Sequence, residues 1–333
     1  MQQINDYTSV DQERFRNEIV QENRPAVLRG LVSHWPSVNA ASRSVRDFCN
    51  YILPMDHRIP AEMFSGSPAI RGQFWYGPQM RGFNFERRPE QLGNALQLLL
   101  QHLDDSEPPA IYLGSIPIGQ SMLQFARENI IPLLEPSIEP RIWIGNKVTV
   151  QTHFDISENL ACVVAGKRRF TLFPPEQLEN LYVGPLDFTM AGQPVSMVPL
   201  HNPDSGKFPK FKIALESAYS AELMPGDAIY IPYMWWHHVE SLSPFNVLVN
   251  YWWDTANPTA GSPFEAMVHA IMSVKNLEPR KREVWQKYFN HYVFEQNGDP
   301  AAHLAPNEKG ILHPMSSPLA AYIKNWLIRA LTR

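Results

Sequence analysis

His153 and Asp155 stand two residues apart in the run Thr152-His153-Phe154-Asp155. Side chains alternate along a β-strand with a period of two, so on a strand both residues point to the same face. An imidazole nitrogen and a carboxylate oxygen on one face form two adjacent corners of a metal site. A second histidine would complete a set of two histidines and one carboxylate, which binds Fe(II) and leaves coordination positions open for a co-substrate and dioxygen.

The second histidine is expected from the run Trp235-Trp236-His237-His238. This run follows a Pro-Gly-Asp turn and an apolar strand, residues 228–231, so it would return the chain to the barrel that carries the first pair. Neighbours on a strand point to opposite faces, so only one of His237 and His238 can reach the metal, and alternation does not decide which. The alternative is that the triplet binds no metal, because most His-x-Asp triplets are a core or surface histidine beside a solvated acid.

Basic side chains gather in the run Gly166-Lys167-Arg168-Arg169, which begins a strand expected beside the one that carries His153. A cation inside a barrel is costly unless a carboxylate neutralises it. One of these side chains is therefore a candidate anchor for a dicarboxylate co-substrate, since guanidinium grips a carboxylate through two hydrogen bonds and ammonium acts as a point charge. The alternative is that all three are solvated turn residues.

The composition is that of a globular protein: 333 residues, 44% hydrophobic and 19% charged, with a formal net charge of −4. Disordered, collagen-like and coiled-coil classes are excluded, and a dominant nucleic-acid-binding surface is not expected. The two cysteines, Cys49 and Cys162, fit a reduced protein better than a disulfide scaffold. No signal-peptide pattern or long apolar run is found in the sequence, so we expect a cytoplasmic location and no membrane partner.

Apolar periodicity divides the chain into three regions. Residues 1–104 are expected to form an N-terminal α/β region packed on the barrel, with helices over 11–22, 45–53 and 89–103 and strands over 25–30 and 69–76. Residues 105–260 carry short strands separated by turns, which indicate a sandwich or barrel: 110–114, 141–144, 148–153, 160–165, 169–173, 221–223, 228–231, 238–241 and 246–252. Residues 261–333 carry helices over 264–274, 282–294 and 319–331, which either cover the barrel or build a homodimer.

Several short motifs follow one another between residues 105 and 254: Trp143-Ile144-Gly145, His153-Phe154-Asp155, Phe173-Pro174-Pro175, Asn202-Pro203-Asp204, Pro225-Gly226-Asp227, Trp235-Trp236-His237-His238 and Asn250-Tyr251-Trp252. Their order resembles the Jumonji-C branch of the cupin superfamily, and most nearly the asparaginyl hydroxylase that inhibits hypoxia-inducible factor. The resemblance implies a mainly β fold with helical additions, in which a double-stranded β-helix, the cupin or jelly-roll core, carries an N-terminal α/β extension and C-terminal helices.

The resemblance also implies the site. It makes His153, Asp155 and His237 the ligands of Fe(II), and so selects His237 over His238. The co-substrates would be 2-oxoglutarate and dioxygen. Tyr112 matches the tyrosine that hydrogen-bonds the distal carboxylate of 2-oxoglutarate, and three further residues match the lining of the co-substrate pocket: Asn159, Asn250 and Trp252.

Two positions depart from the family pattern near the co-substrate. The distal-carboxylate cation is usually a lysine in the nearest relatives, and here that position is Arg168, with Lys167 as the fallback. The hydroxyl usually found three residues before the first ligand is missing, because Val150 stands there. Thr152, which shares strand parity with Val150, is the better candidate to replace it, and Thr149 is the other.

A third departure concerns the substrate. The arginine that positions substrate in the asparaginyl hydroxylase falls at Pro194, so a different substrate is expected. The predicted function is hydroxylation of a protein or peptide side chain, with a tRNA base or a small molecule as alternatives. From other classes, a non-catalytic metal-binding cupin module and a cupin isomerase or lyase remain, but neither has a use for a cation and a tyrosine placed to hold a dicarboxylate.

Overall fold

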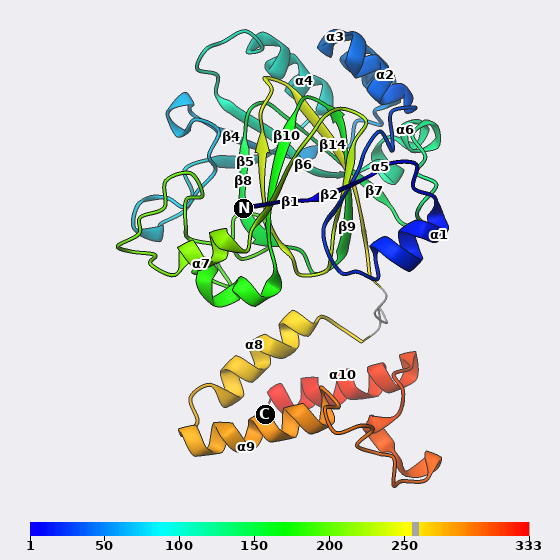
Figure 1. Cartoon of the computed structure of the whole chain (residues 1–333), viewed down its shortest axis with the longest axis vertical. Coiled ribbons are helices and arrows are strands. Elements are labelled where there is room, and N and C mark those ends of the chain that lie inside the picture. Colours follow the sequence, from blue (N-terminus) through cyan, green and yellow to red (C-terminus); the bar gives the residue numbers. More distant parts are fainter. Residues whose placement is uncertain (255–259, 333) are drawn as a thin grey trace. The chain divides into compact units, whose positions relative to one another are not determined.

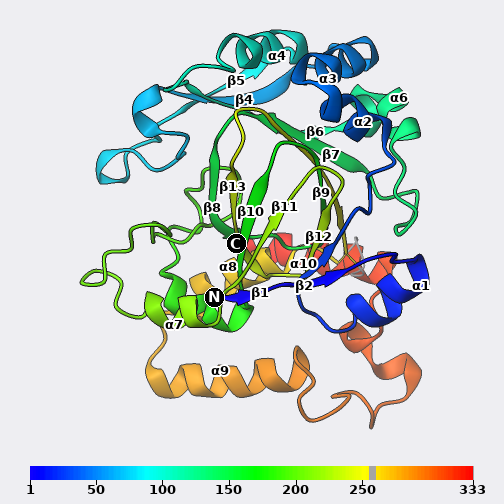
Figure 2. The same cartoon turned by 45° about the horizontal axis from the view of Figure 1, so that its top comes forward.

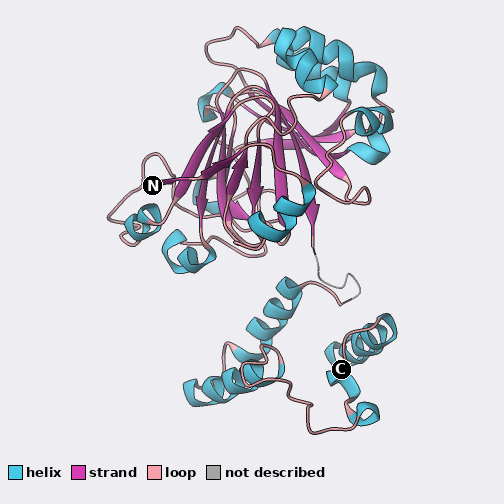
Figure 3. Cartoon of the chain, turned by 45° about the vertical axis from the view of Figure 1, so that its right-hand side comes forward, coloured by secondary structure: helices cyan, strands magenta, loops and turns pink. Residues whose placement is uncertain are grey.

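The structure, a computed structural model, describes residues 1–254 and 260–332 of the chain (Figure 1). The chain divides into two units, Met1–Asp254 and Thr255–Arg333. Within the described residues, the first unit holds every strand, and the second holds helices and connecting segments (Figure 3). The predicted metal-binding residues all lie in the first unit.

A five-stranded sheet carries both predicted histidine runs. Its order is β1 (Gln2–Gln3), β11 (Tyr219–Leu223), β10 (Arg168–Phe173), β13 (Trp236–Ser241) and β8 (Thr149–Phe154). β1 runs parallel to β11, and the other neighbours are antiparallel. Strands far apart in the sequence are therefore neighbours. The expectation that the strand of the basic run lies beside the strand of the His-x-Asp triplet is wrong, because β13 lies between them.

A nine-stranded sheet faces it. Its order is β2 (Asn5–Tyr7), β3 (Ala26–Leu28), β12 (Ala228–Ile231), β9 (Glu158–Ala165), β14 (Asn246–Trp253), β7 (Pro140–Gly145), β6 (Ala110–Pro117), β4 (Ala61–Gly66) and β5 (Glu86–Glu90). Alternate residues of both sheets meet in one buried cluster that includes Val163, Phe170, Leu172 and Ile229. Two sheets closing on a shared apolar core form the predicted cupin-like double-stranded β-helix.

Helices cover the other face of the larger sheet. They are α1 (Gln12–Arg14) with a π-helical turn at Phe15–Ile19, α2 (Pro36–Arg43), α3 (Val45–Ile52), α4 (Leu92–Gln101), α5 (Ile118–Ser121) and α6 (Leu123–Glu128). α2 contacts β9 and α4 contacts β6 (Figure 2). Phe48, Leu96 and Phe125 of these helices share a buried cluster with Ile142 and Val249 of the sheet. Residues 1–104 thus lie in the same unit as the barrel and extend its sheet with β3, β4 and β5.

Most of the predicted elements are confirmed, and the exceptions lie between residues 61 and 90. The strand predicted at 69–76 is wrong: the chain turns at Pro68–Ile70, and Arg71 adopts the left-handed conformation. The strands of this region are β4 and β5, and Pro89, predicted to start a helix, lies in β5. The aromatic residues of 69–76 are typical of strands, but here they reflect burial. Phe74 and Tyr76 pack into an aromatic cluster, and the segment forms no β-strand.

The unit after residue 254 consists of α8 (Pro263–Val274), α9 (Pro279–Tyr292) and α10 (Ser317–Leu331), joined by segments that include short 3₁₀ turns, and it confirms the three predicted C-terminal helices. Large apolar side chains on them are exposed, among them Met272, Trp285, Tyr288 and Trp326. The homodimer expected from these helices stays a prediction. Among the described residues, no helix has the length and apolarity needed to cross a membrane.

The turn before Arg168 generates a stability prediction. Gly166 has φ +73°, and a Cβ there would collide with the side-chain oxygen of Asn246 and the carbonyl of Phe245. Gly82 has φ +64° and open space around its Cβ position. Gly82→Ala should lower the free energy of unfolding by about 1 kcal/mol through backbone strain alone. Gly166→Ala should lower it by a further ~1–3 kcal/mol because of the collision. Denaturant unfolding of the full chain measures both, and equal losses would contradict the predicted packing of this turn.

Candidate metal centre

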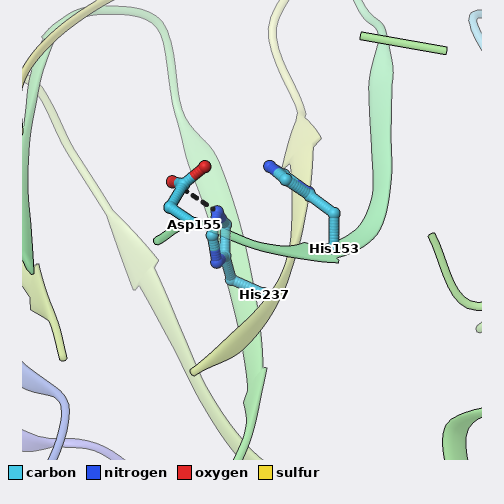
Figure 4. A group of neighbouring side chains, drawn as sticks. All are labelled: His153, Asp155 and His237. Carbon is cyan, nitrogen blue, oxygen red and sulfur yellow. Dashed lines mark ion pairs between the residues drawn. The ribbon is translucent and has the colours of Figure 1, made fainter. Parts of the chain in front are cut away.

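β8 and β13 bring His153, Asp155 and His237 together (Figure 4). His153 lies opposite His237 in the ladder. Their ring centroids are 4.2 Å apart, and Nε2 of His237 lies 3.4 Å from Oδ2 of Asp155. One ligand atom from each residue lies within 4.8 Å of the others. The predicted triad therefore exists as a cluster able to hold one metal ion.

Backbone carbonyls fix both imidazoles. Nδ1 of His153 donates to the carbonyl of Gln151 at 2.8 Å, and Nδ1 of His237 donates to the carbonyl of Trp235 at 3.1 Å. A carbonyl only accepts, so the proton of each neutral ring sits on Nδ1. The lone pair of each Nε2 is left for a metal, which is the arrangement seen in histidine metal ligands.

Hydrogen bonds orient the carboxylate of Asp155. Oδ2 accepts from Nε1 of Trp252 at 3.1 Å and from Nδ2 of Asn159 at 3.3 Å. Burial by itself would raise the pKa of Asp155, but the two neighbouring imidazoles, His237 and His153, and the Trp252 donor together lower it to about 2. Burial and the neighbouring charge of His237 lower the pKa of His153 to about 4. At neutral pH Asp155 is thus ionised and His153 neutral, the forms that bind metals.

The other predicted pocket residues continue from Asp155 as a chain of hydrogen bonds. Nδ2 of Asn250 donates to Oδ1 of Asn159 at 3.3 Å, and Nε1 of Trp143 donates to Oδ1 of Asn250 at 2.7 Å. The Trp143 ring stacks on Tyr112 with centroids 5.9 Å apart. Asn159, Asn250 and Trp252 are therefore brought together as predicted. Trp143 was not singled out as a site residue from the sequence, although it begins one of the recognised motifs.

Arg168 is a buried cation with unused donors. Its side chain is 1% exposed and lines a cavity of about 60 Å³ together with Tyr112, the triad and the asparagines. Nε and Nη2 have no hydrogen-bond partner among the described residues. Burial lowers the pKa of Arg168, with Tyr112 acting in the opposite direction. Uncompensated donors on a buried guanidinium are costly, and an anion in this cavity would accept from them.

Two sequence-predicted residues are not brought to this cavity. β8 contains a bulge, because Val150 pairs with Val239 while His153 pairs with His237. The extra residue changes the parity of the strand, so Val150 lines the cavity with His153, whereas Thr152 has its hydroxyl 3.3 Å from Nδ1 of His238. The expectation that Thr152 replaces the missing hydroxyl is corrected by this geometry. The other is Lys167, the fallback anchor, which pairs with Glu222 and is part-exposed.

A larger cleft of about 510 Å³ leads to the triad. His153 and Asp155 lie in its lining, and Tyr112, Trp143 and Trp252 are shared with the smaller cavity. Other parts of the wall are aromatic, basic and acidic side chains that include Phe64, Phe74, Arg87, Arg141 and Glu62. The segment around Pro194 also contributes, through Met190, Gln193 and Val195. The cleft therefore reaches two of the three triad residues.

Comparison with known proteins places this geometry in a family. Residues 12–259 match the family model described as a cupin-like domain. The chain is 26% identical over 251 residues to a Drosophila melanogaster protein named Jumonji C domain-containing protein 5, covering 73% of this chain and 57% of that protein. It is 26% identical over 254 residues to JmjC domain-containing protein D of Dictyostelium discoideum, covering 69% and 51%. Over 163 residues it is 31% identical to Lysine-specific demethylase JMJ31 of Arabidopsis thaliana, covering 46% and 29%.

These relatives confirm the predicted resemblance at the level of the family and correct its finer part. They carry Jumonji C and demethylase names, and none of the three is the asparaginyl hydroxylase. The chain spans little more than half the length of the first two relatives. The chain therefore shares the family and the fold of these relatives, and the similarity does not by itself transfer the activities of those longer proteins to it.

The hydrogen bond from Trp252 to Asp155 is expected to strengthen metal binding. Trp252→Phe keeps an aromatic ring and removes the donor to Oδ2, which should weaken metal binding by about 10- to 100-fold. Binding of Mn²⁺, a redox-stable stand-in for Fe(II), followed by electron paramagnetic resonance measures this. Trp253→Phe is the matched control, because that ring stacks on Tyr230 and should leave the affinity unchanged. Equal affinities in both variants would show that the Trp252 hydrogen bond does not contribute to metal binding.

Proposed function

The chain belongs to the cupin-like domain family, and we propose on that premise that it is an Fe(II)- and 2-oxoglutarate-dependent oxygenase, acting as a hydroxylase. One observation carries the proposal. A metal-binding triad and a buried arginine with unused donors line the same cavity. A metal-binding cupin module without a dicarboxylate ligand would have no use for that arginine, and neither would a cupin isomerase or lyase.

The residues present fit both missing groups. Nε2 of His153, Nε2 of His237 and a carboxylate oxygen of Asp155 would hold Fe(II), since two imidazoles and one carboxylate leave positions open. Arg168 and Tyr112 would hold the distal carboxylate of 2-oxoglutarate, with Asn159, Asn250 and Trp252 keeping Asp155 and the cavity wall in place. When bound, these groups supply the chemistry: 2-oxoglutarate and dioxygen are converted to succinate and carbon dioxide while a substrate C–H bond is hydroxylated.

The protein's own contribution is orientation and exclusion of water. Gln151 and Trp235 carbonyls hold the imidazoles in one tautomer, so no proton has to leave Nε2 before metal binds. The Trp252 and Asn159 donors share one oxygen of Asp155, which directs the carboxylate. Burial keeps the guanidinium of Arg168 dry, so its charge acts on the co-substrate with little screening by solvent.

The substrate proposed is a protein or peptide side chain entering through the larger cleft. Its aromatic walls and its arginines and glutamate suit a polypeptide segment that offers both apolar side chains and backbone carbonyls. Arg141 lies over the Trp252 ring with its guanidinium carbon 5.8 Å from the centroid and donates to Ser115, so it is held in the wall of the cleft beside Trp252. A net charge of −4 favours this substrate over tRNA.

Oxygenase activity is tested by co-substrate turnover. Full-length protein reconstituted without oxygen with Fe(II) and 2-oxoglutarate should show a visible charge-transfer band, and oxygen should then yield succinate. His153→Ala should abolish both signals, because it removes a ligand. Addition of peptide libraries, including methylated lysine peptides, should raise succinate formation when a substrate is present. A wild-type protein with neither band nor succinate above the variant would refute the proposal.

The role of Arg168 is tested by affinity for 2-oxoglutarate. Arg168→Met keeps a long apolar side chain and removes the charge, and losing one partner of a buried charge pair costs about 2 kcal/mol or more, roughly a 30-fold weaker affinity. Calorimetric titration of the metal-loaded protein measures it. Lys167→Met is the control and should bind normally. The reverse pattern would assign the anchor to Lys167.

A further inference from the structure

A second group of metal-ligand side chains lies on the opposite face of β13. His238 and Glu240 are two residues apart on this strand, and His201 joins them from the segment between β10 and α7 (Phe211–Glu216). One ligand atom from each lies within 4.8 Å of the others. Because His237 points into the cavity and His238 lies beside the Thr152 hydroxyl, this group is separate from the triad.

His238 is the observation that points to a ligand. It is 2% exposed, and its Nε2 has no hydrogen-bond partner among the described residues. Oε2 of Glu240 is also buried without a hydrogen bond there, and Arg169 lies 3.5 Å from it as an ion-pair partner. Burying an imidazole nitrogen without any partner, and a carboxylate oxygen without a hydrogen bond, costs free energy that a bound cation would recover.

We propose that His201, His238 and Glu240 form a second metal site, which takes Zn²⁺ and ties the segment between β10 and α7 to the five-stranded sheet. Two imidazoles and one carboxylate are ligands that zinc accepts, with a water in the fourth position. Arg169 is the cation that opposes binding, but Glu222 accepts from its Nε at 3.2 Å and its Nη2 at 2.7 Å. Glu222, which lies outside the site and also pairs with Lys167, therefore shares in balancing the charge of Arg169.

The contact between His201 and Glu240 has to open slightly to admit a metal ion. Ligands about 2.1 Å from a tetrahedral zinc lie about 3.4 Å from one another. Nε2 of His201 now lies 2.7 Å from Oε1 of Glu240, so the metal would replace this hydrogen bond and move the pair slightly apart. The His201 side chain is 56% exposed and sits on a connecting segment, so it can move, whereas the two strand residues are fixed by their ladder.

The test measures zinc retention. Full-length protein is equilibrated with Zn²⁺, dialysed, and its metal content measured by mass spectrometry. Wild type should retain one more zinc ion per chain than His201→Ala, because both keep the triad. In a His153→Ala, Asp155→Ala background, one zinc should remain, and adding His201→Ala should remove it. His34→Ala, which changes another exposed histidine, is the matched control and should retain zinc like the wild type.

A second readout does not depend on stoichiometry. Added Zn²⁺ should raise the melting temperature of the triad-deficient background, and this rise should vanish with His201→Ala, since a ligand stabilises only the state that binds it. Equal zinc contents in wild type and His201→Ala would overturn the second site. Loss of oxygenase activity would not bear on it, because the comparison rests on zinc content and stability alone.

Discussion

The antiparallel pairing of β8 with β13 is the constraint on which the rest of the site depends. It places His153 opposite His237, and the bulge in β8 lets Val150, His153 and Asp155 face one cavity although their spacing does not follow a single alternation. The same pairing sends His238 to the other face. β13 therefore supplies one residue to the triad and two residues, His238 and Glu240, to the second group on its other face.

A second constraint is the polar interior. Arg168, Asn159 and Asn250 are buried with the triad between two sheets that also share an apolar cluster. Such groups stabilise a fold only when their hydrogen bonds are satisfied, and here the asparagines and Trp143 satisfy one another while Arg168 keeps free donors. The unsatisfied hydrogen-bond donors of Arg168 thus lie where the co-substrate is proposed to bind, so ligand binding should stabilise the barrel.

Local patterns predicted the strands of the barrel and the C-terminal helices because each has a regular apolar period. They missed β4 and β5, whose sequences mix polar and apolar residues without a regular period. β4 pairs with β5 and β6, so it is the partner strands that hold this segment in the sheet. For the site, the ordered motifs pointed to the triad, Arg168 and the asparagines, and the structure brings these residues to one cavity. The same reasoning misplaced Thr152, because strand parity was extended through a bulge that only the β13 partner reveals.

The sequence by itself determined the residue types of the centre, their order along the chain and the family they resemble, since these depend on spacing and composition. Tertiary structure decided which face of the sheet each histidine takes. It also decided that Arg168 is buried with unused donors, that Lys167 pairs with Glu222, and that His201 lies beside Glu240. These outcomes depend on the register between strands distant in sequence and on burial, which no local pattern encodes. The His-x-Asp spacing therefore predicted two ligands, and the β8–β13 register made them a site.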